Sequence, residues 1–163
     1  MTASNKNSVK PTLLIGVGNE FRSDDSAGII AARKLRELLN GDINIFESDG
    51  DGAKLMNMWN GHNNVIIIDA VSFGTSPGTV HVINANKKEF PKETAIHSSH
   101  MFSVAEAIET SRVLNRLPEN LTIYGIEGKT YEMGKGISDE VKESINKVVS
   151  EIQKEIIKST SSK

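Results

Sequence analysis

Near its N-terminus the chain reads LLIGVGNEFRSDD from Leu13 to Asp25. The apolar start predicts a β-strand, the run Gly16-Val17-Gly18 predicts a tight turn, and the residues from Ala27 onward predict a helix. The acidic pair Asp24-Asp25 therefore falls at the C-terminal end of a first strand, the edge at which open α/β sheets bind their ligands. A turn that ends in carboxylates repels anions, so we interpret it as part of a cation site.

The composition is that of one globular domain with its own core. The chain has 163 residues, of which 37% are hydrophobic and 25% are charged, and its formal net charge is −2. This balance provides no basic surface of the kind that binds nucleic acid. Because cysteine is absent, disulfides, thiolate metal sites and a cysteine nucleophile are excluded.

The sequence predicts one domain that does not contact a membrane. No stretch approaches the ~20 apolar residues of a membrane span, and residues 1–10 lack the apolar core of a signal peptide. We therefore expect a cytoplasmic protein. The domain is expected over residues 11–158, with flexible polar tails at 1–10 and 159–163.

Apolar residues alternate between strand-like and helix-like patterns along the chain. The continuous run Val65-Ile66-Ile67-Ile68 is typical of a central strand that is buried on both faces. The strand after Ser76-Pro77-Gly78 follows a tight turn, so we expect it to be antiparallel. We predict strands at about 12–17, 44–47, 65–68, 79–83 and 121–126, and helices at about 24–39, 53–59, 102–115 and 139–158.

This order of elements predicts an α/β fold. We expect a three-layer sandwich, in which helices cover both faces of a mostly parallel, twisted sheet of about five strands. Residues 84–99 are expected to form a long irregular connection, and connections of that length are often functional.

Three residues at expected strand or helix ends are candidates for a metal site. Asp69 ends the central strand, which neighbours the first strand in a doubly wound sheet, so Asp25 and Asp69 would face one crevice. Two carboxylates in one crevice repel each other unless a cation or a shared proton offsets their charge. His100, just before the third helix, adds an imidazole and leaves positions open for water or substrate. These residue types do not identify the metal.

Each candidate also has a purely structural interpretation. Asp24 and Asp25 would cap the first helix, where anions are favoured. Asp69 would form a turn, and His100 would be a helix cap or a surface residue. We expect Asp24 to be the cap, which leaves Asp25 as the ligand.

Other catalytic motifs are absent from the sequence. It contains no Gly-x-Ser-x-Gly elbow, no phosphate-binding P-loop and no third glycine of the dinucleotide fingerprint. The loop Gly128–Gly134, which contains Lys129 and Tyr131, would border the same crevice or be an ordinary turn. The aromatic residues that would line a peptide groove or pack locally are Phe21, Phe73, Phe102 and Tyr131.

Three segments resemble, in the same order, the motifs of the hydrogenase maturation proteases. They are Gly16–Gly28, then Ile67–Val71 with Pro77-Gly78-Thr79 after it, and Ser99–Ala107. Members of that family process the large subunit of nickel–iron hydrogenases. The resemblance covers nearly the whole domain, from about residue 13 to residue 156.

The resemblance implies a phosphorylase/hydrolase-like α/β fold and gives Asp25, Asp69 and His100 both the metal-ligand and the catalytic positions. It implies an endopeptidase that removes the C-terminal extension of a nickel–iron hydrogenase large-subunit precursor after nickel insertion. The nickel would arrive with that precursor, and zinc or cadmium could occupy the same site. For Asp49 the resemblance implies only a place in the wall of the site. Ser26 departs from the glycine that many members have, which leaves the particular hydrogenase open.

Two other functions stay open at this point. The first is a non-enzymatic, nickel-binding maturation chaperone with the same pocket. The second is a peptidyl-tRNA hydrolase-like enzyme, because Leu14–Asn19 resembles the start of that family. The acidic balance argues against an RNA substrate, and no histidine lies between Asn19 and Trp59, where that family has its catalytic one. We expect a monomer or a weak homodimer.

Overall fold

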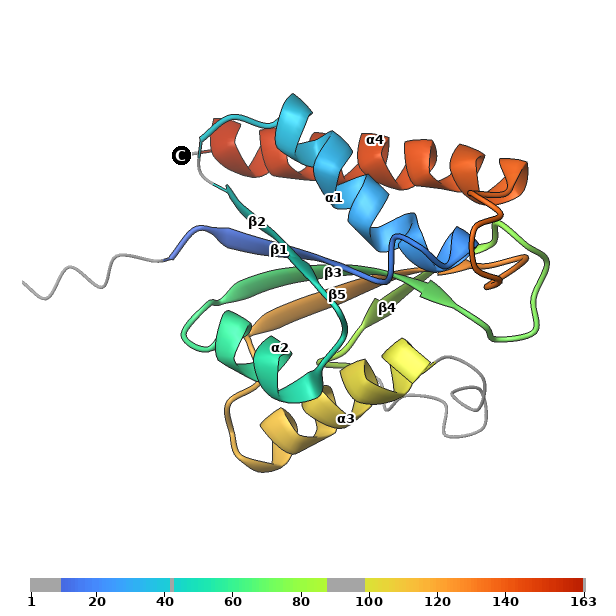
Figure 1. Ribbon diagram of the computed structural model, residues 1–163. Helices are drawn as coiled ribbons and strands as arrows, with labels where there is room; N and C mark the ends of the chain where they lie inside the picture. The colour runs from blue at the N-terminus through green and yellow to red at the C-terminus, as the bar shows by residue number, and fades with distance from the viewer. Residues whose placement is uncertain (1–9, 42, 88–98, 163) are drawn as a thin grey trace, which may run out of the picture.

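The computed structural model describes residues 10–41, 43–87 and 99–162, with the backbone alone at 99–102. Its strands are β1 (Thr12–Val17), β2 (Ile43–Ser48), β3 (Asn64–Val71), β4 (Val80–Asn84) and β5 (Asn120–Glu127). They form one five-stranded sheet in the order β2-β1-β3-β5-β4 (Figure 1). Neighbouring strands are parallel except for β4, which pairs antiparallel with β5 as the sequence predicted.

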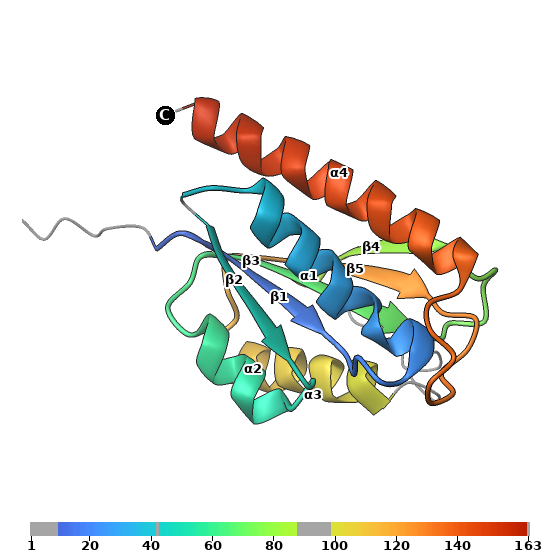
Figure 2. The same ribbon diagram turned by 45° about the horizontal axis from the view of Figure 1, so that its top comes forward.

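Helices cover both faces of this sheet. They are α1 (Ala27–Leu38), α2 (Gly52–Trp59), α3 (Ser99–Val113) and α4 (Asp139–Ser161), and a short 3-10 helix, η1 (Ser23–Ser26), precedes α1. The helices α1 and α4 lie on one face, whereas α2 and α3 lie on the other (Figures 1 and 2). The predicted three-layer α/β fold is therefore confirmed.

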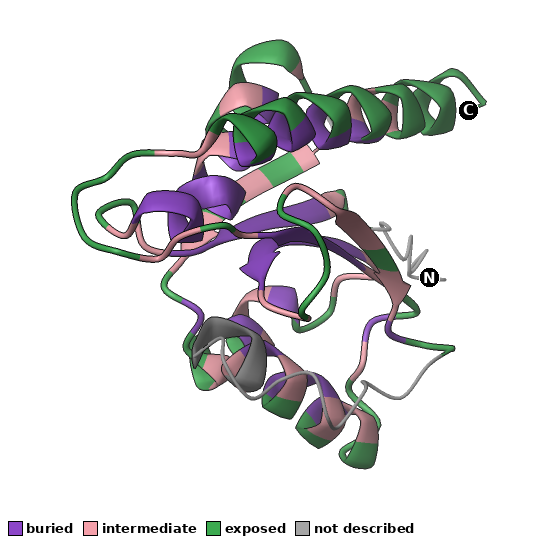
Figure 3. Ribbon diagram, turned by 90° about the vertical axis from the view of Figure 1, so that its right-hand side faces the viewer, coloured by how far each residue is buried: buried purple, intermediate pink, exposed green. Residues whose placement is uncertain are grey.

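The central strand β3 is buried on both faces. Ile66 and Ile68 pack into the core under α1 and α4, whereas Val65 and Ile67 pack into the core over α2 and α3. Since side chains alternate between the faces of a strand, this one apolar run stabilises both layers. The helix α4 shows the complementary pattern, with a buried inner stripe and an exposed outer face (Figure 3).

Two glycines let α1 lie directly on the sheet. A Cβ atom at Gly28 would lie 2.1 Å from the carbonyl oxygen of Ile68 in β3. A Cβ atom at Gly16 in β1 would lie 2.3 Å from the carbonyl oxygen of Gly28. Only glycine permits such contacts between backbones, and they bring η1 onto the C-terminal ends of β1 and β3.

Several element ends differ from the prediction. The first α-helix begins at Ala27 rather than residue 24, because residues 23–26 form η1. The third helix begins at Ser99, so His100 lies within its first turn rather than before it. The last helix extends to Ser161, which makes residues 159–161 helical. Most of the expected irregular connection, residues 88–98, lies outside the described residues.

In the part of the chain that the structure describes, every helix is too short or too polar to cross a membrane.

Candidate functional site

The strands β1 and β3 end side by side, as the sequence predicted, with Gly16 opposite Ile68. Asp69 follows Ile68 and is 0% exposed, and Asp25 in η1 is 2% exposed. Since η1 packs against β3, the two carboxylates predicted to share a crevice come to the same edge of the sheet. Both lie in a low-dielectric environment, where charges interact more strongly than in water.

Tyr131 lies within the electrostatic field of this edge. Burial is the largest cause that raises the pKa of its phenol, and three carboxylates raise it further. These are Glu127, Asp69 and Asp25, in decreasing order of effect. The charges of these three carboxylates therefore act on one phenol. The backbone of the loop Gly128–Gly134 also donates to the Asp24 carboxylate in η1, so the structure favours the first of its two interpretations, the border of the crevice, over an ordinary turn.

The glycine turn after β1 closes around the backbone of Asp25. The N–H of Asn19 donates to the carbonyl of Asp25 at 3.2 Å, and the N–H of Asp25 donates to the carbonyl of Arg22 at 3.0 Å. A Cβ atom at Gly18 would lie 2.0 Å from the Asp25 carbonyl oxygen. Gly18 is thus required sterically, because a glycine at this position allows the chain to fold back tightly on Asp25.

The residue before the acidic pair is strained. Ser23 has a φ of 47°, in the left-handed region, which costs a residue with a Cβ atom on the order of 1–2 kcal/mol. Its hydroxyl donates to the carbonyl of Glu132, and the Nε of Arg22 donates to the carbonyl of Tyr131 at 3.3 Å. The loop after β5 therefore holds this conformation from outside the turn.

The expectation that Asp24 caps the first helix is wrong. Its side chain is 0% exposed, and neither η1 nor α1 has a side-chain cap bond. The carboxylate instead accepts hydrogen bonds from the backbone N–H groups of Lys129 (2.7 Å), Thr130 (3.0 Å) and Ser138 (2.8 Å), and from the Ser138 hydroxyl (2.9 Å). A buried carboxylate requires several donors, and here they come from the loop after β5 and from the first residue before α4 rather than from the helix that follows Asp24 in sequence.

Glu127 is a site residue that the sequence reasoning missed. It ends β5, is 3% exposed, and accepts from the N–H groups of Phe73 (2.9 Å) and Gly74 (3.0 Å). His81 lies close by, with its Nε2 3.6 Å from the carboxylate. Glu127 therefore anchors the turn that follows Asp69. The signal was present in the sequence, because Glu127 follows a buried strand in the same way as Asp69 does.

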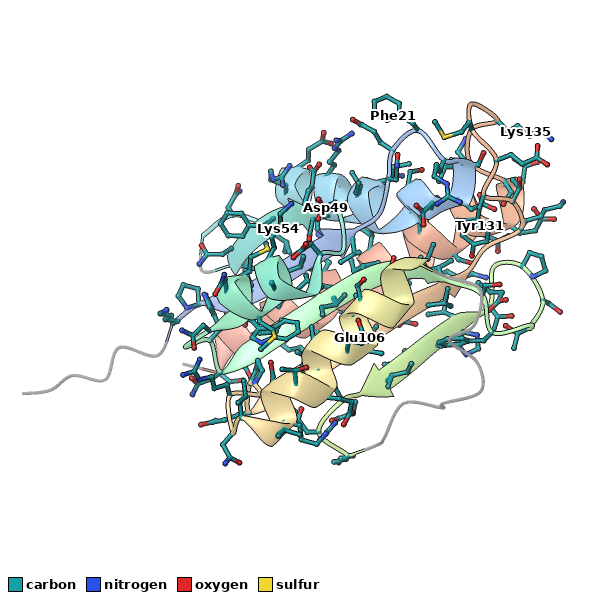
Figure 4. All side chains as sticks on the ribbon, turned by 60° about the horizontal axis from the view of Figure 1, so that its bottom comes forward. Phe21, Asp49, Lys54, Glu106, Tyr131 and Lys135 are labelled. Carbon is teal, nitrogen blue, oxygen red and sulfur yellow. The ribbon has the colours of Figure 1, made fainter. Side chains whose placement is uncertain are left out.

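Asp49 lies in an open hollow beside the glycine turn. Its carboxylate pairs with Lys54 at 2.8 Å, and that hydrogen bond holds the pKa of Asp49 below its usual range. The hollow has a volume of about 530 Å³ and includes Gly18 and Phe21 in its lining. Figure 4 shows Asp49 and Lys54 side by side, with Phe21 pointing outward. Asp49 is thus close to the turn that carries Asp25, which is compatible with a place in the site wall.

His100 belongs to the first turn of α3. The start of α3 lies on the side of the molecule where β1 and β3 end (Figures 1 and 2). Its side chain lies outside the described residues, as does that of Phe102. Among the side chains that are described, no three acidic or histidine residues are arranged to hold a metal ion. The set of Asp25, Asp69 and His100 therefore stays a prediction.

A family model described as hydrogenase maturation protease matches residues 30–155 of this chain. The chain belongs to this family. The match begins after the glycine turn, so the resemblance of Gly16–Gly28 to the first motif supports the assignment independently. A solved structure, the [NiFe] hydrogenase maturation protease HybD from Thermococcus kodakarensis, is 31% identical, with a TM-score of 0.71 over 88% of this chain and 97% of that one.

Other members of the family extend the comparison. The hydrogenase maturating endopeptidase HybD from E. coli has a TM-score of 0.76 over 91% of this chain and 93% of its own; at 22% identity it supports the fold. The hydrogenase expression/formation protein HupD of Rhizobium leguminosarum bv. viciae is 28% identical over 71% of this chain. The match spans 58% of the length of that protein and 61% of a second HupD, so these curated relatives are longer.

Proposed function

We propose that this chain is the endopeptidase that removes the C-terminal extension of a nickel–iron hydrogenase large-subunit precursor after nickel insertion. The observation that carries the proposal is the burial of Asp25 and Asp69, from two separate motifs, at adjoining strand ends in a member of this family. Membership of the family favours this activity over the peptidyl-tRNA hydrolase alternative.

The nickel reaches the site as part of the substrate. Asp25, Asp69 and His100 would contact it, because buried carboxylates attract a divalent cation strongly where water screens poorly. Zinc or cadmium would compete for the same carboxylate and imidazole groups, which do not discriminate sharply among these ions. Nickel held there would polarise the scissile carbonyl or activate a water molecule.

Selectivity for the precursor that has received its nickel follows from the same contacts. A precursor without nickel would present no cation to the carboxylates of Asp25 and Asp69, and its scissile bond would not be fixed in the crevice. Holding the scissile bond in a fixed place beside the groups that react with it can supply much of the rate enhancement of an enzyme. The protease therefore requires no sequence-specific pocket to recognise completed nickel insertion. We place the reaction in the cytoplasm and expect a monomer or a weak homodimer.

The test is incubation of the purified chain with a nickel-loaded large-subunit precursor, followed by mass spectrometry of the large subunit. The expected result is loss of the C-terminal extension with the wild type and no loss with Asp69→Asn. Glu119→Gln is the matched control, because Glu119 is an exposed acid. A precursor that keeps its mass but stays in a complex with the chain would establish the chaperone alternative instead.

A nickel-free precursor provides the second arm of this experiment. The proposal expects it to remain uncleaved by the wild type under the same conditions. Equal cleavage of nickel-loaded and nickel-free precursors would overturn the role of nickel while leaving the endopeptidase activity intact.

A further inference from the structure

The loop after β5, residues 128–138, is joined to two parts of the site at once. Towards η1, the Asp24 carboxylate accepts from Lys129 and Thr130 at 2.7 and 3.0 Å. Towards β3, the Tyr131 hydroxyl donates to the carbonyl of Val71 at 2.7 Å. The loop therefore forms a bridge between the turn that carries one candidate ligand and the strand that carries the other.

Backbone contacts strengthen the side of this bridge that faces η1. The N–H of Asp24 donates to the carbonyl of Thr130 at 3.1 Å, and the N–H of Gly134 donates to the carbonyl of Phe21 at 3.1 Å. The bridge is thus fixed to the turn by backbone hydrogen bonds as well as by the buried Asp24 carboxylate. Asp25 follows Asp24 directly, so a displacement of the bridge would be transmitted to the backbone that carries the Asp25 carboxylate.

The side that faces β3 depends on fewer contacts. The carbonyl of Val71 accepts from the N–H of Gly128 at 3.0 Å as well as from the Tyr131 hydroxyl. A Cβ atom at Gly128 would lie 2.4 Å from that hydroxyl oxygen, so the glycine leaves the space that the phenol occupies. Val71 is two positions after Asp69 on the same strand. The Tyr131 hydroxyl is therefore the side-chain contact that connects the bridge to the strand of Asp69.

We infer that Asp24 and Tyr131 are positioning residues that set the separation of the Asp25 and Asp69 carboxylates. This inference rests on the proposed function, since it concerns the same site. Neither residue needs to touch the substrate: Asp24 fixes η1 to the bridge, and Tyr131 fixes the bridge to β3. Groups that orient metal ligands in this way affect metal affinity or activity by about 10- to 100-fold when they are removed.

The two tyrosines of the chain supply a matched pair of variants. Tyr131→Phe removes the hydroxyl that bonds to Val71 but keeps the ring. Tyr124→Phe removes a hydroxyl that bonds to Glu155 at 3.3 Å, on the outer part of α4. Both variants lose one phenolic hydrogen bond, and only Tyr131→Phe alters the bridge.

The experiment measures Cd²⁺ and Ni²⁺ affinity by calorimetry, precursor cleavage, and thermal unfolding for the wild type and both variants. We expect Tyr131→Phe to weaken metal binding and to lower kcat by about tenfold or more, with KM changed less. We expect Tyr124→Phe to match the wild type in metal affinity and kcat. Its change in melting temperature should be similar to that of Tyr131→Phe, because each variant loses one hydrogen bond. Asp24→Asn provides a further variant, because an amide offers one acceptor oxygen where the carboxylate offers two.

Crystal structures of the wild type and Tyr131→Phe complete the test. An unchanged distance between the Asp25 and Asp69 carboxylates, with unchanged metal affinity, would overturn the inference. Failure of the wild type to cleave any precursor would remove the proposed function alone, because metal affinity and the carboxylate distance still decide the role of Tyr131.

Discussion

The carboxylate of Asp24 accepts hydrogen bonds from the backbone N–H and the hydroxyl of Ser138, at 2.8 and 2.9 Å, although 114 residues separate the two in sequence. This contact joins the first motif of the chain to the start of the last helix. It also explains why Asp24 is buried rather than exposed at a helix terminus.

The acidic residues of the site should control metal binding. Asp25→Asn and Asp69→Asn each replace a buried, charged oxygen ligand with a neutral amide, so the attraction to a divalent cation falls. We expect each variant to bind Ni²⁺ at least about tenfold more weakly than the wild type, as measured by calorimetry. Glu119→Gln, an exposed control, should bind as the wild type does. Wild-type affinity in both site variants would remove these residues from the ligand set.

Glu127 should stabilise the fold through the turn after β3. Its carboxylate accepts from the N–H groups of Phe73 and Gly74, and a glutamine at 127 would keep one acceptor oxygen, so one of these two N–H groups loses its charged acceptor. We expect Glu127→Gln to lower the free energy of unfolding by about 1–3 kcal/mol, measured by urea denaturation. An effect no larger than that of Glu119→Gln would show that the turn does not depend on the carboxylate.

The contact between α1 and the sheet should tolerate no side chain. A methyl group at Gly28 would lie 2.1 Å from the backbone oxygen of Ile68, so Gly28→Ala forces α1 away from β3. We expect a loss of about 1–3 kcal/mol in the free energy of unfolding. Gly52→Ala is the comparison with a milder contact, because its Cβ atom would lie 3.1 Å from the carbonyl oxygen of Ser103, which a small shift relieves, and alanine favours the helix α2. Similar losses in both variants would contradict the steric explanation.

Stability should fall in alkaline solution as the tyrosines ionise. Burial, together with the charges of Glu155 and Glu151, raises the pKa of Tyr124 from 10.0 to about 12, and the pKa of Tyr131 is raised as well. Because both folded-state pKa values exceed the unfolded value, the stabilisation by the protonated phenols is fully present below about pH 10. The part that comes from Tyr124 is lost as the pH rises towards 12, and the part that comes from Tyr131 is lost at higher pH.

Ultraviolet absorbance of phenolate across that range checks this prediction, with urea denaturation at each pH. In Tyr124→Phe the remaining phenolate should appear only at still higher pH or on unfolding. Ionisation of both phenols near pH 10 in the folded protein would contradict the buried environment of the two side chains.

The elements that sequence reasoning predicted correctly are those with strong local signals. The β-branched run at residues 65–68 predicted a central strand, and the short turn at residues 76–78 predicted the antiparallel β4. The apolar spacing in residues 141–152 predicted the buried stripe of α4. Helix starts were predicted less well, because a 3-10 turn such as η1 has no separate apolar period by which it could be recognised.

The role of Asp24 shows what local reasoning could not provide. An acidic residue before a helix is most simply interpreted as a cap, and nothing near Asp24 in sequence indicates donors at residues 129–138. The position of Glu127 after a buried strand was visible in the sequence, but its partners were not, since they lie in the turn at residues 73–74 and become neighbours only when β3 and β5 pair.

The sequence alone determined the α/β fold, the family and the location of Asp25 and Asp69 near the C-terminal ends of two neighbouring strands, although β3 continues to Val71, two residues beyond Asp69. Hydrophobic periodicity and glycine turns are local properties, and they are sufficient to order parallel strands. Only the tertiary structure decided which of the two adjacent acids in η1 is fixed by the loop after β5, and that Tyr131 connects this loop to β3. Those contacts join residues about 100 positions apart, and a hydrogen bond between distant segments forms only after the core has brought their backbones together.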